Sequence, residues 1–308
     1  GITPMKCKRC KALAAVALPS HHTGFCPECF LKYFADQVER GAHKHKLFDH
    51  SDKILVALSG GKDSLALMQV LTDLEYDVTG LHIDLGIGES SEAARGFVTA
   101  FCEKRGLPFH VLSTAHYGLA IPDVKAAVRR PICSVCGKIK RYYFNKFAHE
   151  NGFTALATGH NLDDETARLF ANTLRWDARY LGSQGPMLPG EGKFVRKVKP
   201  LYRLTEFETA AYCFLRKVEH GKAACPYSGG ATFTGHKRLM GGLERVSPGM
   251  KIQFYEGFLR DGRPAFQAAC KEGTDALVEC AKCGYPSMSE TCGVCRTRGM
   301  VAEKTAGR

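Results

Sequence analysis

Short apolar runs alternate with helical patterns through the middle of the chain. Runs of strand length occupy residues 54–58, 78–83, 109–112 and 155–158, and each precedes a helical pattern or a polar loop. This alternation is typical of a parallel sheet with helices on both faces. We therefore expect an α/β fold.

Helical spacing of apolar residues is found in four segments, at 31–40, 64–75, 134–150 and 205–218. Thr205 and Glu208 are spaced as a capping box at the start of the last of these. We expect the aromatic side chains of residues 134–150 to pack in the core. Residues 41–50 are rich in His and Lys and are expected to form a linker. The basic, Gly- and Pro-containing stretch 175–199 is expected to be a loop that faces the substrate.

The charge balance is strongly basic. The chain has 308 residues, with 43 Lys and Arg against 31 Asp and Glu, which gives a net charge of +12. Such a charge favours a polyanionic partner such as RNA, although a solubilising surface is the alternative. No apolar run reaches the roughly 18 residues that a membrane span needs, and no secretory signal pattern opens the chain. We expect a cytosolic protein with no membrane partner.

The run Ser59-Gly60-Gly61-Lys62-Asp63-Ser64 directly follows the first apolar run. Two glycines let the main chain approach a phosphate, and the first amides of the following helix point at the anion with the positive end of the helix dipole. Lys62 adds a mobile positive charge. The glycine spacing and Asp63 differ from the Walker pattern, so a kinase or GTPase is disfavoured.

Two further loops follow strands of the predicted sheet, where ligands collect in open α/β folds. His82-Ile83-Asp84 is suited to holding an adenosine. The loop Gly159-His160-Asn161-Leu162-Asp163-Asp164 carries paired acids that could hold Mg²⁺ or orient a reacting carbonyl. The alternative is that Asp163 and Asp164 cap the next helix, and both roles can coexist.

Fourteen cysteines in an intracellular chain favour metal or sulfur chemistry over structural disulfides. Eight of them form two quartets of paired Cys-x-x-Cys motifs, one near each end. Each quartet predicts a structural zinc knuckle with no open coordination position, whose folding depends on the metal. The ligands are Cys7, Cys10, Cys26 and Cys29 in the first quartet and Cys280, Cys283, Cys292 and Cys295 in the second.

A mid-chain pair, Cys133 and Cys136, has Cys225 as its expected distant partner. Three thiolates on a four-iron cluster would leave one iron open, whereas zinc would require a fourth protein ligand. A persulfide on Cys136 or Cys225, resolved through a disulfide, is the alternative. The remaining isolated cysteines, Cys102, Cys213 and Cys270, are expected to be buried small hydrophobes.

The glycine-rich run resembles the PP-loop of ATP pyrophosphatases, which form AMP and pyrophosphate. Together with Pro-Ile-Cys-Ser-Val-Cys-Gly at 131–137, Thr-Gly-His-Asn-Leu-Asp-Asp at 158–164, Cys225-Pro226-Tyr227 and both cysteine quartets, it resembles the tRNA 2-thiouridine synthetase family. The resemblance implies a PP-loop fold, a [4Fe-4S] cluster on the three mid-chain cysteines, zinc in both knuckles, a homodimer and a tRNA substrate. It also implies that Lys140 and Asp164 act at the catalytic centre.

The implied reaction is adenylation of the C2 oxygen of a uridine, followed by replacement with sulfur from a thiocarboxylated carrier protein or sulfide. Mg²⁺ would assist, and the expected nucleotide-binding residues are Ala57, Leu58, Ser59, Gly60, Gly61, Lys62, Asp63, Ser64, His82, Ile83, Lys140, Gly159 and Asp163. Alternatives are a cytidine thiolase, an amide-forming ligase and a non-catalytic zinc-knuckle RNA-binding protein.

The expected domains are an N-terminal knuckle (1–30), a helix and linker (31–50), a catalytic domain (51–272) and a C-terminal knuckle with a tail (273–308).

Overall fold

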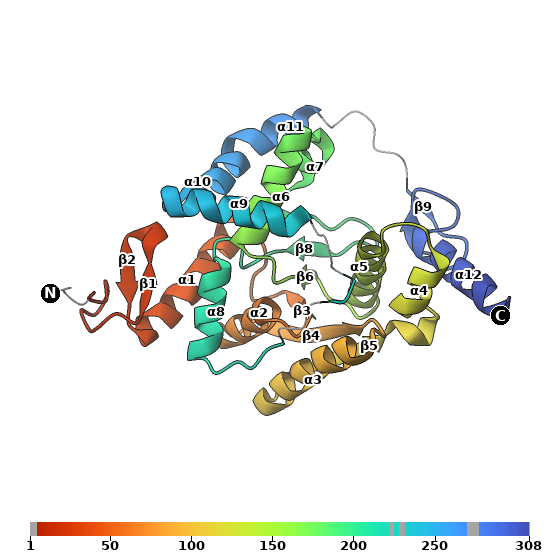
Figure 1. The fold of residues 1–308 in the computed structure, drawn as a ribbon, viewed down its shortest axis with the longest axis horizontal. Helices are drawn as coiled ribbons and strands as arrows, with labels where there is room; N and C mark the ends of the chain where they lie inside the picture. The colour runs from red at the N-terminus through yellow and green to blue at the C-terminus, as the bar shows by residue number, and fades with distance from the viewer. Residues whose placement is uncertain (1–4, 222–224, 228–231, 270–276, 308) are drawn as a thin grey trace.

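A six-stranded sheet forms the centre of the molecule (Figure 1). The computed structural model describes residues 5–221, 225–227, 232–269 and 277–307. The strand order is β5-β4-β3-β6-β8-β7, and all neighbours are parallel except β7 and β8. The strands are β3 (Lys53–Leu58), β4 (Asp77–Asp84), β5 (Phe109–Ser113), β6 (Ala155–Ala157), β7 (Met187–Leu188) and β8 (Arg196–Val198).

Both faces of the sheet are covered by helices, because alternate residues of a strand point to opposite faces. On β3, Ile54, Val56 and Leu58 join one buried cluster, and Leu55 joins the other. The first cluster includes side chains of α1 (Pro27–His45), α2 (Lys62–Asp73), α3 (Gly88–Arg105) and α8 (Glu206–Leu215). The second includes α4 (Ile121–Ala127), α5 (Ile132–Glu150) and α12 (Gly293–Ala306). This arrangement confirms the predicted fold class.

A separate group of helices packs around its own small core, at the top of Figure 1. Leu162, Leu169, Leu181, Tyr202 and Tyr255 are its buried members. The helices are α6 (Leu162–Arg175), α7 (Ala178–Ser183), α9 (Thr232–Val246), α10 (Met250–Gly257) and α11 (Arg263–Ala269), with a π-helical turn at Phe258–Gly262. No helix in the described ranges is long and apolar enough to cross a membrane.

The two cysteine quartets lie near opposite ends of the molecule (Figure 1). Near the first, β1 (Val16–Leu18) and β2 (Thr23–Phe25) form a hairpin around the short helix Pro19–His21, and Val16 and Phe25 join the first core cluster. The second quartet is built with β9 (Val278–Glu279) and β10 (Pro286–Ser287), and three of its cysteines join the second cluster. The two knuckles therefore join the buried clusters on different sides of the sheet.

Two segments that the sequence predicted to be irregular, the linker at 41–50 and the loop at 175–199, contain helices or strands. The short helix at 31–40 is part of α1, which runs to His45 and therefore occupies half of the expected linker. Its apolar face continues through Val38 and Ala42, and the basic residues of its last turn complement the helix dipole. The expected loop at 175–199 contains α7, β7 and β8. Its basic residues obscured the strand, in which Arg196 pairs with Asp52 while Val198 is buried.

Candidate nucleotide and sulfur site

The strand order reverses between β3 and β6, since β4 and β5 lie to one side of β3 and β6 and β8 to the other. In an open parallel sheet, the loops at the carboxyl ends of two such strands diverge and leave a crevice that binds ligands. The loop after β3 is the predicted phosphate loop, and the loop after β6 is the predicted acidic loop. The topology therefore brings the two together.

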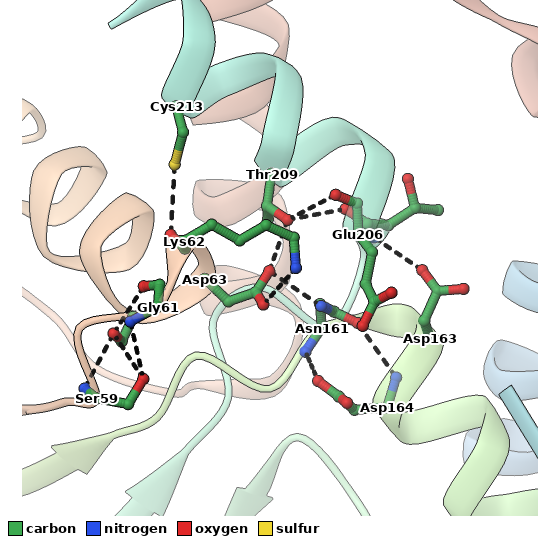
Figure 2. Close-up of polar contacts among 12 residues, drawn as sticks. Ser59, Gly61, Lys62, Asp63, Asn161, Asp163, Asp164, Glu206, Thr209 and Cys213 are labelled. Carbon is green, nitrogen blue, oxygen red and sulfur yellow. Dashed lines mark hydrogen bonds and ion pairs between the residues drawn. The ribbon is translucent and has the colours of Figure 1, made fainter. Parts of the chain in front are cut away.

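The phosphate loop is a closed turn at the start of α2 (Figure 2). The main-chain N–H of Ser59 donates to Oγ of Ser64 over 3.1 Å, and that hydroxyl donates to the carbonyl of Gly61 over 3.0 Å. Gly60 has a φ of +79°, and a Cβ there would lie 2.8 Å from the carbonyl oxygen of Ala94 on α3. Only glycine fits this position without strain. The turn leaves the first amides of α2 available to an anion.

The acidic loop is held against the phosphate loop by Asp63 (Figure 2). Oδ1 of Asp63 accepts hydrogen bonds from Nδ2 of Asn161 over 3.1 Å and from the Thr209 hydroxyl over 2.6 Å. Its other oxygen pairs with Nζ of Lys62 over 2.9 Å. Gly159 permits this approach, because a Cβ there would lie 2.8 Å from the Ser64 nitrogen. Asp63 thus joins the turn, α6 and α8.

Both acids of the predicted Mg²⁺ pair are engaged by lysines. Oδ1 of Asp164 lies 2.6 Å from Nζ of Lys237 on α9, and Oδ1 of Asp163 lies 2.5 Å from Nζ of Lys251 on α10. Asp164 also completes a capping box with Asn161 at the start of α6, which confirms the capping alternative for this residue. Burial raises the pKa of Asp164, but Lys237 and the Asn161 amide outweigh that effect and lower it.

His82 lies at the carboxyl end of β4 and is 4% exposed. Its Nδ1 is 2.9 Å from the carbonyl of Leu58, and burial lowers its pKa, so the ring is neutral. Its Nε2 is buried and has no hydrogen-bond partner among the described residues. The side chains of Leu58 and Ile83 belong to the two core clusters, so a nucleotide could contact only their main chain.

The mid-chain cysteines meet at the start of α5. Cys133 and Cys136 lie one turn apart, and Sγ of Cys133 lies 3.4 Å from the carbonyl of Tyr227, two residues after Cys225. Burial raises the pKa of the Cys136 thiol, the charge of Lys140 opposes this, and nearby Cys225 and Cys133 raise it further. The three thiols and Lys140 therefore share one electrostatic environment.

A backbone hydrogen bond links the phosphate loop to the chain segment that carries Cys225. The N–H of Gly221 donates to the carbonyl of Gly60 over 2.9 Å. A Cβ at Gly221 would lie 3.1 Å from the ring of Phe97, so this segment passes between α3 and the loop. Gly221, which contacts the phosphate loop, therefore lies four positions before Cys225 in the chain.

The terminal quartets have the geometry of single-ion sites. In each, the four sulfurs lie within 4.8 Å of one another, and among the described residues these are the two metal-ligating groups gathered so closely. Sulfur pairs lie 3.5 Å apart for Cys10 and Cys26 and 3.8 Å apart for Cys283 and Cys292. Zn–S bonds of about 2.3 Å would place tetrahedral sulfurs about 3.8 Å apart. The eight cysteines are free thiols, which disfavours the disulfide alternative.

Each quartet contains a thiol that ionises easily. Desolvation raises the pKa of Cys7, but main-chain amides of Cys10, Cys26 and Arg9 outweigh it and lower the pKa to about 6. The pKa of Cys280 is likewise about 6, because amides of Cys292, Lys282 and Cys283 outweigh desolvation. Thiolates are the form that binds metal. Of the isolated cysteines, Cys102 and Cys213 are buried as predicted, and Cys270 lies outside the described residues.

Four polar residues of the site were absent from the sequence-based assignment. Lys237, Lys251 and Thr209 reach the acids from α9, α10 and α8, and Asn161 was part of a motif but had no assigned role. No motif surrounds the two lysines, so their role depends on the helix packing. The sequence did carry a signal for Asn161, because it precedes the Asp163-Asp164 pair at the start of a helix and Asn is a preferred N-cap residue.

Fold and site together define a protein of the PP-loop class, and the PP-loop domain family model matches residues 33–222. A second family model, the N-terminal LIM domain of the 2-thiouridine synthetase TtuA, matches residues 6–31. The chain is 41% identical over 300 residues to the tRNA-5-methyluridine(54) 2-sulfurtransferase of Pyrococcus horikoshii, covering 97% of this chain and 95% of the relative. It is 41% identical over 293 residues to that of Thermus thermophilus, covering 95% and 90%.

Among solved structures, the fold is similar to that of the U34-tRNA thiolase NcsA from Methanococcus maripaludis with its [4Fe-4S] cluster. The TM-score is 0.79 at 27% identity, covering 96% of each chain. The chain belongs to the tRNA 2-sulfurtransferase family, and it is therefore a sulfurtransferase enzyme. These findings confirm the resemblance that the ordered motifs predict.

Proposed function

We propose that the protein is an ATP-dependent tRNA 2-sulfurtransferase that acts on uridine 54. Relatives that are 41% identical carry that position in their names, whereas the U34 thiolase is 27% identical. The reaction has two steps. The uridine C2 oxygen attacks the α-phosphorus of ATP and releases pyrophosphate; sulfide then attacks C2, and AMP leaves with the former oxygen.

The chain's own residues would stabilise the charge that develops in the first step. Amides at the start of α2 would bind the departing pyrophosphate, with Lys62 as a mobile counter-charge. Lys62 pairs with Asp63 in the structure, and phosphate oxygens would compete for its ammonium group. Lys140 lies on the same face of α5 as Cys136 and would contact the phosphates from the sulfur side. Asp164 would orient the reacting groups.

The residues present suit an iron–sulfur cluster at the mid-chain cysteines. Cys133, Cys136 and Cys225 offer three thiol donors. They belong to neither of the two quartets whose four sulfurs lie close enough to bind one metal ion. When bound, a [4Fe-4S] cluster with three protein ligands would supply an open iron that can hold sulfide. A persulfide on the same cysteines is the alternative route. A thiocarboxylated carrier or sulfide as donor, zinc in both knuckles, Mg²⁺ and a homodimer complete the proposal.

The observation that carries the proposal is the Gly221–Gly60 hydrogen bond, because it connects the phosphate loop directly to the segment that leads to Cys225. A non-catalytic RNA-binding protein would have no need for this connection. An amide-forming ligase would have no use for the three thiols.

The test separates the two steps. With unmodified tRNA, ATP, Mg²⁺ and sulfide under anaerobic conditions, AMP formation reports adenylation and mass spectrometry of nucleosides reports 2-thiouridine. We expect Cys136→Ala to retain tRNA-dependent AMP formation and lose thiolation, and Gly60→Ala to lose both. Cys102→Ala, which removes a buried thiol elsewhere, should retain both. Thiolation that survives alanine at Cys133, Cys136 and Cys225 together would overturn the mechanism.

Iron and acid-labile sulfide analysis of the same variants distinguishes the two sulfur routes. About four irons per chain in the wild type, lost in the triple variant, would support the cluster. Activity without bound iron would exclude the cluster. The persulfide route additionally predicts activity with a donor of sulfane sulfur, because sulfide cannot form a persulfide without an oxidant. A product with sulfur on cytidine, or at position 34, would correct the substrate assignment.

A further inference from the structure

Trp176 is the single tryptophan of the chain, and it is 73% exposed at the end of α6. It occupies the first position beyond the helix with a φ of +50°. The N–H of Asp177 donates to the carbonyl of Asn172, and that of Trp176 to the carbonyl of Thr173, which is the Schellman pattern. Glycine is the residue favoured at this left-handed position. Because the side chain is mostly exposed, packing within the fold does not explain a large aromatic residue at this position.

Exposed apolar, aromatic and cationic residues lie within four positions of Trp176 in the chain. Leu174 is 62% exposed and Tyr180, on α7, is 63% exposed. Arg175 and Arg179 are also exposed, and among the described residues neither pairs with a carboxylate. Within the described part of the chain, Arg175 donates a hydrogen bond to the amide oxygen of Asn172 over 2.9 Å and makes no ion pair. The surface therefore combines aromatic faces with unneutralised positive charge.

We propose that Trp176, Tyr180, Arg175 and Arg179, termed here the α6–α7 surface, bind unpaired bases and adjoining phosphates of the RNA substrate. The inference rests on the proposed function and extends it to a substrate-binding surface. Aromatic side chains stack on bases that are free of a duplex, and arginines neutralise the phosphates beside them. Each of the two arginines directly precedes one of the aromatic residues in sequence.

The position of the surface fits a contact away from the reacting base. α6 begins in the catalytic region with Asp163 and Asp164 and ends at Arg175. Its 14 residues span about 20 Å at about 1.5 Å per residue. Figure 1 shows α6 leading from the central sheet to α7 at the outer edge of the helical group. The surface would thus contact nucleotides distant from the uridine at the phosphate loop.

A second copy of the chain is a less suitable occupant of this surface. A two-fold contact centred on Trp176 would bring Arg175 and Arg179 of both copies together, and like charges oppose such an interface. RNA carries the complementary charge, and the net charge of +12 favours it further.

The single tryptophan makes the proposal directly measurable. Titration of the full-length protein with unmodified tRNA should quench Trp176 fluorescence, whereas an RNA duplex without loops should quench it much less. Anisotropy of labelled tRNA then gives the affinity of variants. We expect Trp176→Gly to weaken binding by about 5- to 150-fold, the range for loss of one stacked base. Trp176→Phe should retain most of the affinity, and Arg175→Ala with Arg179→Ala should weaken binding and flatten its salt dependence.

The stability of Trp176→Gly and one control variant separate loss of the stacking contact from unfolding and from loss of an exposed aromatic ring elsewhere. Trp176→Gly should fold at least as stably as the wild type, because it relieves the left-handed conformation, so weaker binding cannot come from unfolding. Phe214→Ala removes an 82% exposed aromatic residue on α8 and should bind tRNA as the wild type does. In thiolation assays Trp176→Gly should raise KM for tRNA and leave kcat nearly unchanged.

If the Trp176→Gly variant bound tRNA as tightly as the wild-type protein does, the proposal would be overturned. A change in sedimentation from dimer to monomer in that variant would also overturn it, because the surface would then be an interface between copies. Quenching by tRNA together with no 2-thiouridine formation by the wild type would instead refute the proposed function and leave the surface intact.

Discussion

Nδ2 of Asn161 donates a hydrogen bond to Oδ1 of Asp63 over 3.1 Å, and this contact joins the loop after β6 to the first turn of α2 (Figure 2). The same side chain caps α6, since its Oδ1 accepts the N–H of Asp164 over 3.1 Å. One amide group therefore aligns the phosphate loop with the helix that carries the acidic pair.

Substitutions at Asn161 should separate its two roles. Asn161→Ala loses both the cap and the contact with Asp63, and should lower the free energy of unfolding by about 1–2 kcal/mol. Asn161→Ser keeps a capping hydroxyl but cannot reach Asp63, so most stability should remain while KM for ATP rises. Urea unfolding and tRNA-dependent AMP formation measure the two effects. Equal loss of stability in both variants would contradict this division.

Lys237 should hold Asp164 ionised and in place. Its Nζ lies 2.6 Å from Asp164 and 2.5 Å from Glu206, and the pair lowers the pKa of Asp164 although burial opposes this. A carboxyl group whose pKa is lower in the folded state stabilises the fold at pH values above its pKa in the unfolded chain, about 3.9. This stability is lost as the pH falls through the pKa of the folded state. Lys237→Met should therefore lower the free energy of unfolding by about 1–3 kcal/mol at pH 7 and by progressively less in acid.

Two matched variants test the assignment of Lys237. Lys237→Arg keeps the charge and should retain most stability, while Lys104→Met on the exposed side of α3 should change it by less than about 0.5 kcal/mol. Denaturant unfolding at pH 7 and at a pH well below about 3.9, where the Asp164 carboxyl gains a proton in the folded state, measures the effect. An equal cost of Lys237→Met at both pH values would exclude the charge interaction.

Acidification below about pH 6.5 should destabilise the protein through His82. Burial lowers its pKa, so the folded state keeps the ring neutral while the unfolded chain binds a proton at about pH 6.5. Stability then falls as pH decreases through this window, because the unfolded state binds more protons. His82→Gln removes the titration, and its melting temperature should vary less between pH 7 and pH 5. An unchanged pH slope in that variant would assign the effect to other groups.

Loss of one knuckle ligand should remove one metal ion. Cys283→Ala should reduce zinc from about two ions to about one per chain, since four thiolates complete each site. The ring of Tyr285 lies 4.6 Å from that of Tyr142 on α5, so the damage should extend to the helix that carries Cys133 and Cys136. Cys102→Ala should keep both ions. Elemental analysis and thermal unfolding provide the readouts, and full zinc content in Cys283→Ala would refute the site.

The sequence by itself determined the features that depend on neighbouring residues. The Gly60-Gly61 turn, the Thr205–Glu208 capping box and the cysteine quartets each act through groups only a few positions apart, and the structure contains all three. The alternation of apolar strands with helices also determined the fold class. Local periodicity expresses which face of an element is buried, and this requires no knowledge of its partners.

The tertiary structure decided the features that depend on distant residues. Lys237 and Lys251 reach the acidic pair from helices whose sequences carry no signal for it, because ion pairing across helices depends on their packing. β8 was hidden by its basic residues, and its pairing with β6 and β7 makes it a strand. The exposure of Trp176 likewise emerges from the arrangement of α6 and α7, since a local pattern cannot tell a buried tryptophan from one that faces solvent.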